Sequence, residues 1–177
     1  MQRDLELKVE AFLNIAKIDI TPRCATIDDV SNILLLLTAV APEIPLLLDT
    51  QERCRKIEEY LREWVGYGES CVVVDNSGQV IGFLLVRPDE DNFFRKNKAL
   101  HLAYAGVAEN QRGRGIFRAL IAHMLGRNVP LTATVKAQNK SGMVKRLRCM
   151  NFEEISARGD GQESRFIWKP NAIENRK

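Results

Sequence analysis

Two glycines and two arginines stand directly before a helix-like run in the stretch GVAENQRGRGIFRALIAHML, residues 106–125. Gly113 and Gly115 allow backbone angles that other residues avoid, and they let a ligand approach the main chain closely. The expected helix start adds unpaired N–H groups and about half a positive charge from the helix dipole. Arg112 and Arg114 add positive charge and hydrogen-bond donors beside these groups. The segment therefore predicts a site that binds an anion such as a phosphate.

Two well-known phosphate loops do not fit this segment. A dinucleotide-binding fingerprint needs Gly-x-Gly-x-x-Gly, and the third glycine position holds Arg118. A P-loop needs Gly-Lys followed by Ser or Thr, which the chain lacks. An ordinary tight turn before a helix stays open as the simplest alternative, because two glycines alone do not exclude it.

The glycine segment lies between a predicted strand and a predicted helix, and the rest of the chain supplies further elements of both kinds. Apolar spacing predicts helices over residues 4–16, 30–39, 51–65, 116–125 and 141–150. Alternating residues predict a strand around Ile18 and Ile20, a hairpin within 71–89 that turns at Asn76 to Gly78, and strands over 99–107, 131–136, 152–157 and 163–169.

This order of elements indicates one α/β (α+β) domain. We expect a mixed, mostly antiparallel, twisted sheet of about six to seven strands flanked by helices. Residues 1–17 are assigned to an extra N-terminal helical extension, 18–170 to the domain, and 171–177 to a frayed tail.

Composition and charge exclude several functional classes. The 177 residues are 45% hydrophobic and 28% charged, as expected of one domain with its own core. The net charge of +3 is too small to indicate nucleic acid or membrane binding, and the charged N-terminus lacks the apolar run of a signal peptide. Four scattered cysteines and two histidines show no metal-binding spacing. We therefore expect a cytoplasmic, metal-free protein with reduced and mostly buried thiols.

The segment VAENQRGRGIF resembles motif A of the GNAT superfamily of N-acetyltransferases, whose form is Q/R-x-x-G-x-G/A. Arg112 and Gly115 match the first two fixed positions, whereas Phe117 stands where Gly or Ala is usual. The segments IDITPRCATIDDV, VVVDNSGQVIGFLLV and NKSGMVKRLRCMNF resemble other parts of the family in the same order, with Asn151 where Gly is usual. The resemblance covers roughly residues 18–169.

The resemblance implies that acetyl-CoA is the cosubstrate and that its acetyl group passes directly to the amine of a small molecule or peptide. By the same resemblance, the main chain of Ala105 and Val107 contacts the pantetheine arm. Asn139 reaches that arm as well, although it could instead start the helix that follows. The amides that hold the pyrophosphate are then those of Arg112, Gly113, Arg114, Gly115, Ile116 and Phe117.

His101 is the predicted base, since it lies on the strand before the loop, where relatives often carry a Glu or His that accepts the proton of the amine. A histidine packed against a helix is the alternative. Glu109 is the second candidate base, and Tyr104 belongs either to the core or to the thioester pocket. Many relatives place a proton-donating Tyr where this chain has Leu147, so no proton donor is assigned; nearby Cys149 is expected in the core.

Three questions stay open at the level of sequence. One alternative function is a catalytically weak acyl-CoA binder or sensor on the same fold, and another is nucleic-acid binding through RGRGIFR. The acceptor is unknown: the leucines of loop 41–50 could form an apolar lid, with Glu43 or Asp49 holding a cationic amine. The N-terminal helix could also serve a homodimer contact.

Overall fold

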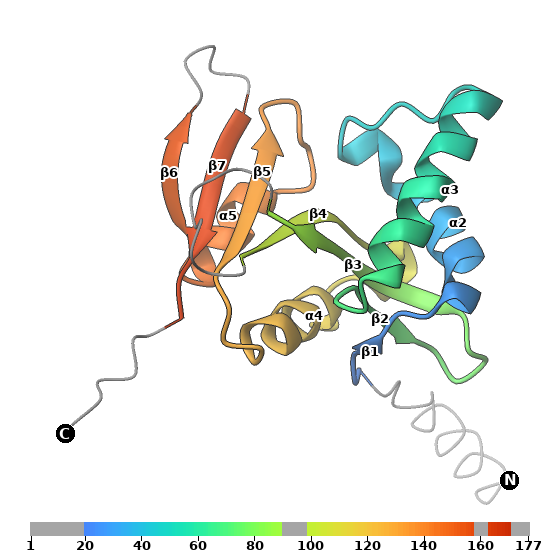
Figure 1. Ribbon diagram of the computed structural model, residues 1–177, viewed down its shortest axis with the longest axis horizontal. Helices are drawn as coiled ribbons and strands as arrows, with labels where there is room; N and C mark the ends of the chain where they lie inside the picture. Colours follow the sequence, from blue (N-terminus) through green and yellow to red (C-terminus); the bar gives the residue numbers. More distant parts are fainter. Residues whose placement is uncertain (1–19, 90–98, 158–162, 171–177) are drawn as a thin grey trace, which may run out of the picture.

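A seven-stranded sheet runs through the computed structural model, which describes residues 20–89, 99–157 and 163–170 (Figure 1). The strands are β1 (Arg23–Cys24), β2 (Cys71–Val74), β3 (Val80–Pro88), β4 (Leu100–Val107), β5 (Leu131–Lys136), β6 (Glu153–Ala157) and β7 (Glu163–Trp168). Their order is β1-β2-β3-β4-β5-β7-β6, and every pair except β4–β5 is antiparallel. The predicted mixed, mostly antiparallel sheet is confirmed.

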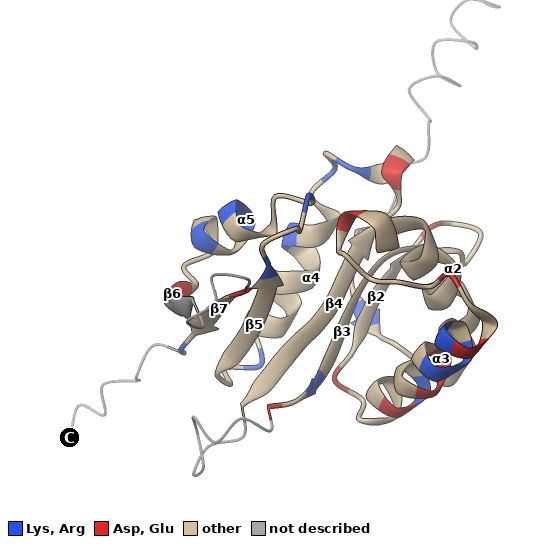
Figure 2. Cartoon of the chain, turned by 90° about the horizontal axis from the view of Figure 1, so that it is seen from above, with Lys and Arg blue, Asp and Glu red and all other residues tan. Residues whose placement is uncertain are grey.

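Helices cover both faces of this sheet. They are α2 (Val30–Val40), α3 (Gln51–Gly66), α4 (Ile116–Leu125) and α5 (Met143–Cys149), with single 3₁₀ turns at Ile27–Asp29, Ala41–Glu43 and Glu109–Gln111. Helices α2 and α3 pack on one face, whereas α4 and α5 pack on the other (Figures 1 and 2). Each face therefore buries its own apolar cluster, which is the main favourable contribution to folding.

The start of α2 is fixed by the buried carboxylate of Asp29. It accepts hydrogen bonds from both Nη atoms of Arg23, at 2.7 and 2.8 Å, and from the main-chain N–H of Thr26 at 2.8 Å. The hydrogen bonds from Arg23 are the main reason that the pKa of Asp29 is lowered, against the opposing effect of burial. A capping box thus ties β1 to the first helix of the domain.

Two predicted elements differ from the structure. The first strand is Arg23–Cys24 and begins after Ile20, which packs against the core without pairing; Ile18 lies outside the described residues. The helix predicted over 141–150 begins at Met143, because Gly142 takes a left-handed conformation with φ of 70° and ends the preceding turn. Ile20 is apolar because its side chain is partly buried against the core, and not because it pairs in the sheet.

The expectation of mostly buried thiols is wrong. Cys71 is buried, Cys54 is half-buried, and Cys24 and Cys149 are exposed; all four are free thiols. Burial raises the pKa of Cys71 to about 12, so this thiol stays protonated at neutral pH. The exposed cysteines lie on a short edge strand and at the last residue of α5, where apolar packing does not enclose them.

Two predictions fall outside the described residues: the N-terminal helix over 4–16 and the frayed tail over 171–177. In the described ranges no helix is long and apolar enough to cross a membrane. The same ranges contain no cluster of three His, Cys, Asp or Glu side chains that could hold a metal.

We predict that Gly82→Ala destabilises the protein, because Gly82 lies on β3 directly beneath the first turn of α4. A Cβ at this position would come within 2.4 Å of Ile116 Cγ2 and 3.4 Å of Leu120 Cδ1. Such overpacking lowers the free energy of unfolding by about 1–3 kcal/mol, which urea denaturation measures. Gly66→Ala at the end of α3 is the control, since nothing lies within 4 Å of its Cβ. Equal effects of both changes would contradict the prediction.

Candidate functional site

The strands β4 and β5 pair over three residues and then separate. The parallel pairs are Leu100–Leu131, His101–Thr132 and Leu102–Ala133. Next to this point the register of β3 and β4 shifts, so that Leu102 to Tyr104 lie opposite only Leu85 and Val86. Such a bulge bends its strand and increases the local twist, which turns the second half of β4 away from β5.

The second half of β4 turns main-chain polar groups toward this gap. Ala108 donates its N–H to the carbonyl of Ile81 at 2.9 Å, which fixes the alternation of hydrogen-bonded pairs between β3 and β4. Ala105 and Val107 therefore belong to the non-hydrogen-bonded pairs, whose N–H and C=O groups point away from β3. In agreement, Arg112 Nε donates to the carbonyl of Val107 at 3.3 Å. An extended ligand in the gap would meet these groups.

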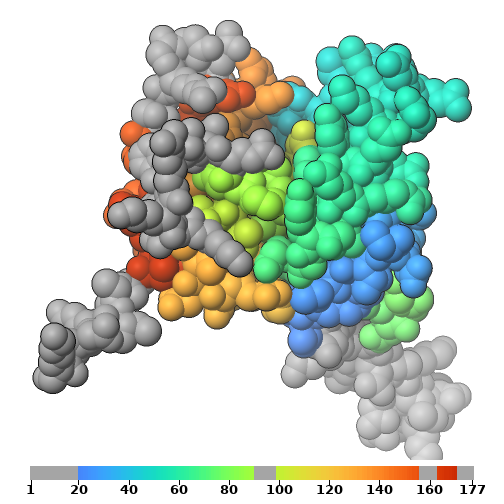
Figure 3. All heavy atoms as spheres, viewed as in Figure 1, coloured from blue at the N-terminus to red at the C-terminus, as the bar shows by residue number. Residues whose placement is uncertain are grey.

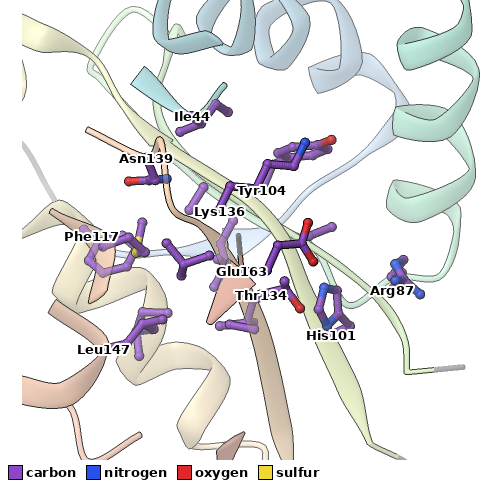
Figure 4. A pocket seen from close by; sticks show the side chains of 18 of the residues that line it. Ile44, Arg87, His101, Tyr104, Phe117, Thr134, Lys136, Asn139, Leu147 and Glu163 are labelled. Carbon is purple, nitrogen blue, oxygen red and sulfur yellow. The ribbon is translucent and has the colours of Figure 1, made fainter. Parts of the chain in front are cut away.

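A cavity of about 300 Å³ occupies the gap. Phe117 and Leu147 line its apolar end, whereas His101, Arg87 and Thr134 lie around its polar end (Figure 4). From outside, atoms of β3 and β4 are recessed between those of α3 and those of β5 and β7 (Figure 3). The predicted base therefore lines a cavity instead of packing in the core.

His101, itself half-buried, begins a chain of polar groups at the polar end that includes the buried Thr132. Its Nδ1 lies 3.0 Å from Thr132 Oγ1, and this hydroxyl donates to Asp89 Oδ2 at 2.9 Å. Arg165 Nη2 lies 3.3 Å from the same Asp89 oxygen, which marks that side chain as a carboxylate. Because Thr132 gives its one proton to Asp89, it accepts from Nδ1–H of His101. The lone pair of the neutral imidazole then lies on Nε2.

A passage and a groove continue the cavity toward the N-terminus of α4. The passage, about 180 Å³, shares Ala105 and Phe117 with the cavity, and it shares Val107 and Phe117 with the groove. The groove is about 840 Å³ and lies between α4 and α5. The cavity, the passage and the groove therefore adjoin one another in a row from His101 to the start of α4.

The start of α4 presents its main-chain N–H groups as predicted. Gly113 and Gly115 have φ angles of 79° and 85°, which favour glycine, and both line the groove. None of the hydrogen bonds among the described residues uses an N–H of residues 113–118 as its donor. The helix dipole and these donors together suit a bound anion.

The basic side chains around the groove differ from those that the sequence singled out. Arg112 lines the groove, but its guanidinium contacts Glu43 Oε1 at 2.8 Å; Arg114 is exposed and does not line it. Three further cations do, namely Arg118, Lys145 and Arg146. Figure 2 shows that Lys and Arg residues gather on α5. The sequence segments RGRGIFR and NKSGMVKRLRCMNF contain these three cations, but no role at the anion site was predicted for them.

Of the other predicted residues, Asn139 lines the cavity, Cys149 lines the groove, and Glu109 lines neither. Asn139 lines the cavity, and its Oδ1 accepts from the N–H and hydroxyl of Ser141 at 3.0 and 2.6 Å, so it closes a turn before α5. Glu109 is exposed in a 3₁₀ turn and lines neither the cavity nor the groove. Cys149 is exposed and lines the groove, which corrects the expectation that it lies in the core.

Comparison with known proteins gives both a family and a fold. A model of the acetyltransferase (GNAT) family matches residues 40–140, more than half of the chain. Among solved structures, a variant of an agmatine N-acetyltransferase in its apo form is 15% identical, with a TM-score of 0.64 over 84% of this chain and 98% of that one. No curated protein sequence matches the chain.

Two further structures have the same fold. A GNAT-family acetyltransferase from Bacillus cereus is 21% identical, with a TM-score of 0.61 over 84% of this chain and 96% of that one. A chain of the NatC complex bound to Gag peptide and CoA is 14% identical, with a TM-score of 0.59 over 84% and 97%. At these identities the likeness shows the fold.

We predict that Tyr104 ionises late in a pH titration. Burial raises the pKa of this phenol, and the nearby Arg87 charge offsets the rise only in part. Because the folded pKa exceeds that of the unfolded chain, about 10, the free energy of unfolding falls as pH rises above that value. The phenolate absorbance of the wild type minus that of Tyr104→Phe isolates this group. Ionisation at or below the ordinary value would contradict the burial.

Proposed function

The chain belongs to the GNAT acetyltransferase family, and on that premise we propose that it transfers the acetyl group of acetyl-CoA to a primary amine by direct attack. The observation that carries this proposal is the row of adjoining spaces from His101 to the start of α4. The row is long, main-chain groups line its middle and its α4 end, and it opens onto basic side chains. These features match an elongated thioester that carries a diphosphate.

The donor-binding part of the proposal follows the predicted contacts. The amide of Arg112, which the sequence had included, donates to the carbonyl of Glu109 at 3.2 Å and is not part of this site. The diphosphate lies against the amides of residues 113–117, where the helix dipole and the cations Arg118, Lys145 and Arg146 favour negative charge. The pantetheine arm follows the passage and pairs with the main chain of Ala105 and Val107. Asn139, at the edge of the cavity, is a further polar partner for the arm.

The chemical step places His101 beside the attacking nitrogen. The amine attacks the thioester carbonyl carbon, a C–N bond forms, the C–S bond breaks, and the sulfur leaves as a thiolate that becomes the CoA thiol on gaining a proton. The proton lost by the nitrogen passes to His101 Nε2, the basic atom that the Thr132 and Asp89 contacts define. Glu109 does not line the cavity and is therefore not assigned this role. Leu147 is buried and apolar, so the proton for sulfur comes from another group or from water.

We predict saturable binding of acetyl-CoA at concentrations below 1 mM by isothermal titration calorimetry. The double change Lys145→Glu and Arg146→Glu weakens this binding at least tenfold, because hydrogen bonds to charged groups each contribute about 1.5–3 kcal/mol. Arg55→Glu is the control, since Arg55 is exposed on α3, pairs with Glu59 and does not line the groove. Absence of saturable binding by the wild type would overturn the proposed function.

We also predict that His101→Ala lowers kcat by about 10²–10⁴-fold while leaving acetyl-CoA binding within about twofold. Thiol release from acetyl-CoA in the presence of an amine panel measures kcat. Thr132→Val retains the imidazole and removes its partner, so it gives a smaller loss with an altered pH profile. Unchanged kcat in His101→Ala would remove this residue from the mechanism. Turnover by the wild type with any amine would reject the weak-binder alternative.

A further inference from the structure

A second opening leads to His101 from the α3 face of the sheet. This outer pocket, about 470 Å³, is lined by the leucines of loop 41–50, by α3, and by the ends of β3 and β4. It shares Arg87, His101, Ala103 and Tyr104 with the cavity. An amine that enters through the outer pocket therefore reaches the proposed base from the side opposite the α4 groove.

The outer pocket has only positive charge among its lining side chains. Arg53, Lys56 and Arg87 line it, and no Asp or Glu of the described residues does. Glu43 and Asp49, the carboxylates that the sequence offered for a cationic amine, pair with Arg112 and Arg53 and lie outside this lining. The lining of the outer pocket therefore favours an acceptor that carries an anion, whereas the carboxylates Asp89 and Glu163 line the adjoining cavity, where the amine would react.

Arg87 would place that anion close to the reacting nitrogen. It lies directly opposite His101 in the β3–β4 register and on the same face, where cross-strand Cα atoms are about 4.5–5.5 Å apart (Figure 4). Its Nη1 donates to the carbonyl of Pro88 at 3.2 Å, which steadies the guanidinium at this strand end. The planar fork of arginine matches a carboxylate. An amine at His101 and a carboxylate at Arg87 are thus separated by a few bonds, as in an α-amino acid.

The rest of the outer pocket is apolar and aromatic. The rings of Tyr60 and Trp64 stack with their centroids 5.6 Å apart. The centroids of the Trp64 and Tyr104 rings are 5.8 Å apart. Leu46 and Leu48 are half-buried, whereas Leu47 is 66% exposed. This wall can accept a large apolar side chain, since exposed leucine and aromatic surface gains free energy when it is covered.

We propose that the acceptor is an α-amino acid with a bulky apolar or aromatic side chain. Its carboxylate binds Arg87, its nitrogen faces His101, and its side chain lies against Trp64 and the leucines. This proposal rests on the proposed function. The reaction forms one C–N bond and breaks the C–S bond of the thioester, so that an N-acetyl amino acid and the CoA thiol are the products.

The test compares acceptors that differ only in charge, by thiol release from acetyl-CoA. We expect kcat/KM for L-phenylalanine and L-leucine to exceed that for their carboxamides and for phenethylamine at least tenfold, and to exceed that for putrescine by more. A wild-type preference for the carboxamides or for putrescine would overturn the acceptor class and leave the acetyltransferase intact. No turnover with any amine, together with no acetyl-CoA binding, would overturn the proposed function itself.

Variants of Arg87 test the contact that carries the proposal. Arg87→Gln lowers kcat/KM for L-phenylalanine at least tenfold, mainly by raising KM, but changes that for phenylalaninamide less than threefold; Arg87→Lys restores part of the loss. Arg55→Gln, which alters an exposed arginine of α3 with 72% of its side chain accessible, changes neither value. Equal losses for the acid and the carboxamide in Arg87→Gln would show that Arg87 does not bind a carboxylate.

Discussion

The short parallel pairing of β4 with β5 is the constraint on which the cavity, the passage and the groove depend. Three residue pairs join the strands, and a longer ladder would use the main-chain groups of Ala105 and Val107 and leave no room for a ligand. The bulge next to the pairing and the side chains of Phe117 and Leu147 keep the strands apart beyond it. Of the main-chain groups thus left without a strand partner, the carbonyl of Val107 accepts from Arg112, and the others need water or a ligand, because unpaired main-chain groups are costly to bury.

Local pattern predicted the elements that form this arrangement. The bounds of α4 and β5 agree with the sequence to the residue, since Gly115 and Pro130 stand directly before them and their apolar periods are regular. The first strand was misplaced because Ile20 is buried without pairing. The start of α5 was predicted too early because the sequence pattern does not show that Gly142 has a positive φ, which places it before the helix.

The candidate site was predictable only where it is local in sequence. The loop before α4 holds its glycines and amides within a few residues, so motif and chemistry coincide there. His101 contacts Thr132, which lies 31 residues away in the sequence. Asp89 pairs with Arg165, which lies 76 residues away in the sequence. Those contacts exist only after β5 and β7 enter the sheet. Arg87 likewise became relevant only through its register with His101.

The Glu43–Arg112 pair has a consequence for how a diphosphate would bind beside it. Glu43 also accepts, through its carbonyl, the N–H of Lys140 at 2.9 Å, so the turn after α2 is tied to both sides of the passage. Each side chain of the pair is more than a third exposed, and such pairs contribute about 0–1 kcal/mol. A diphosphate can therefore take Arg112 from Glu43 at little cost. That exchange would release one of the two tethers between the turn after α2 and the opposite wall of the passage, whereas the main-chain contact with Lys140 would stay in place.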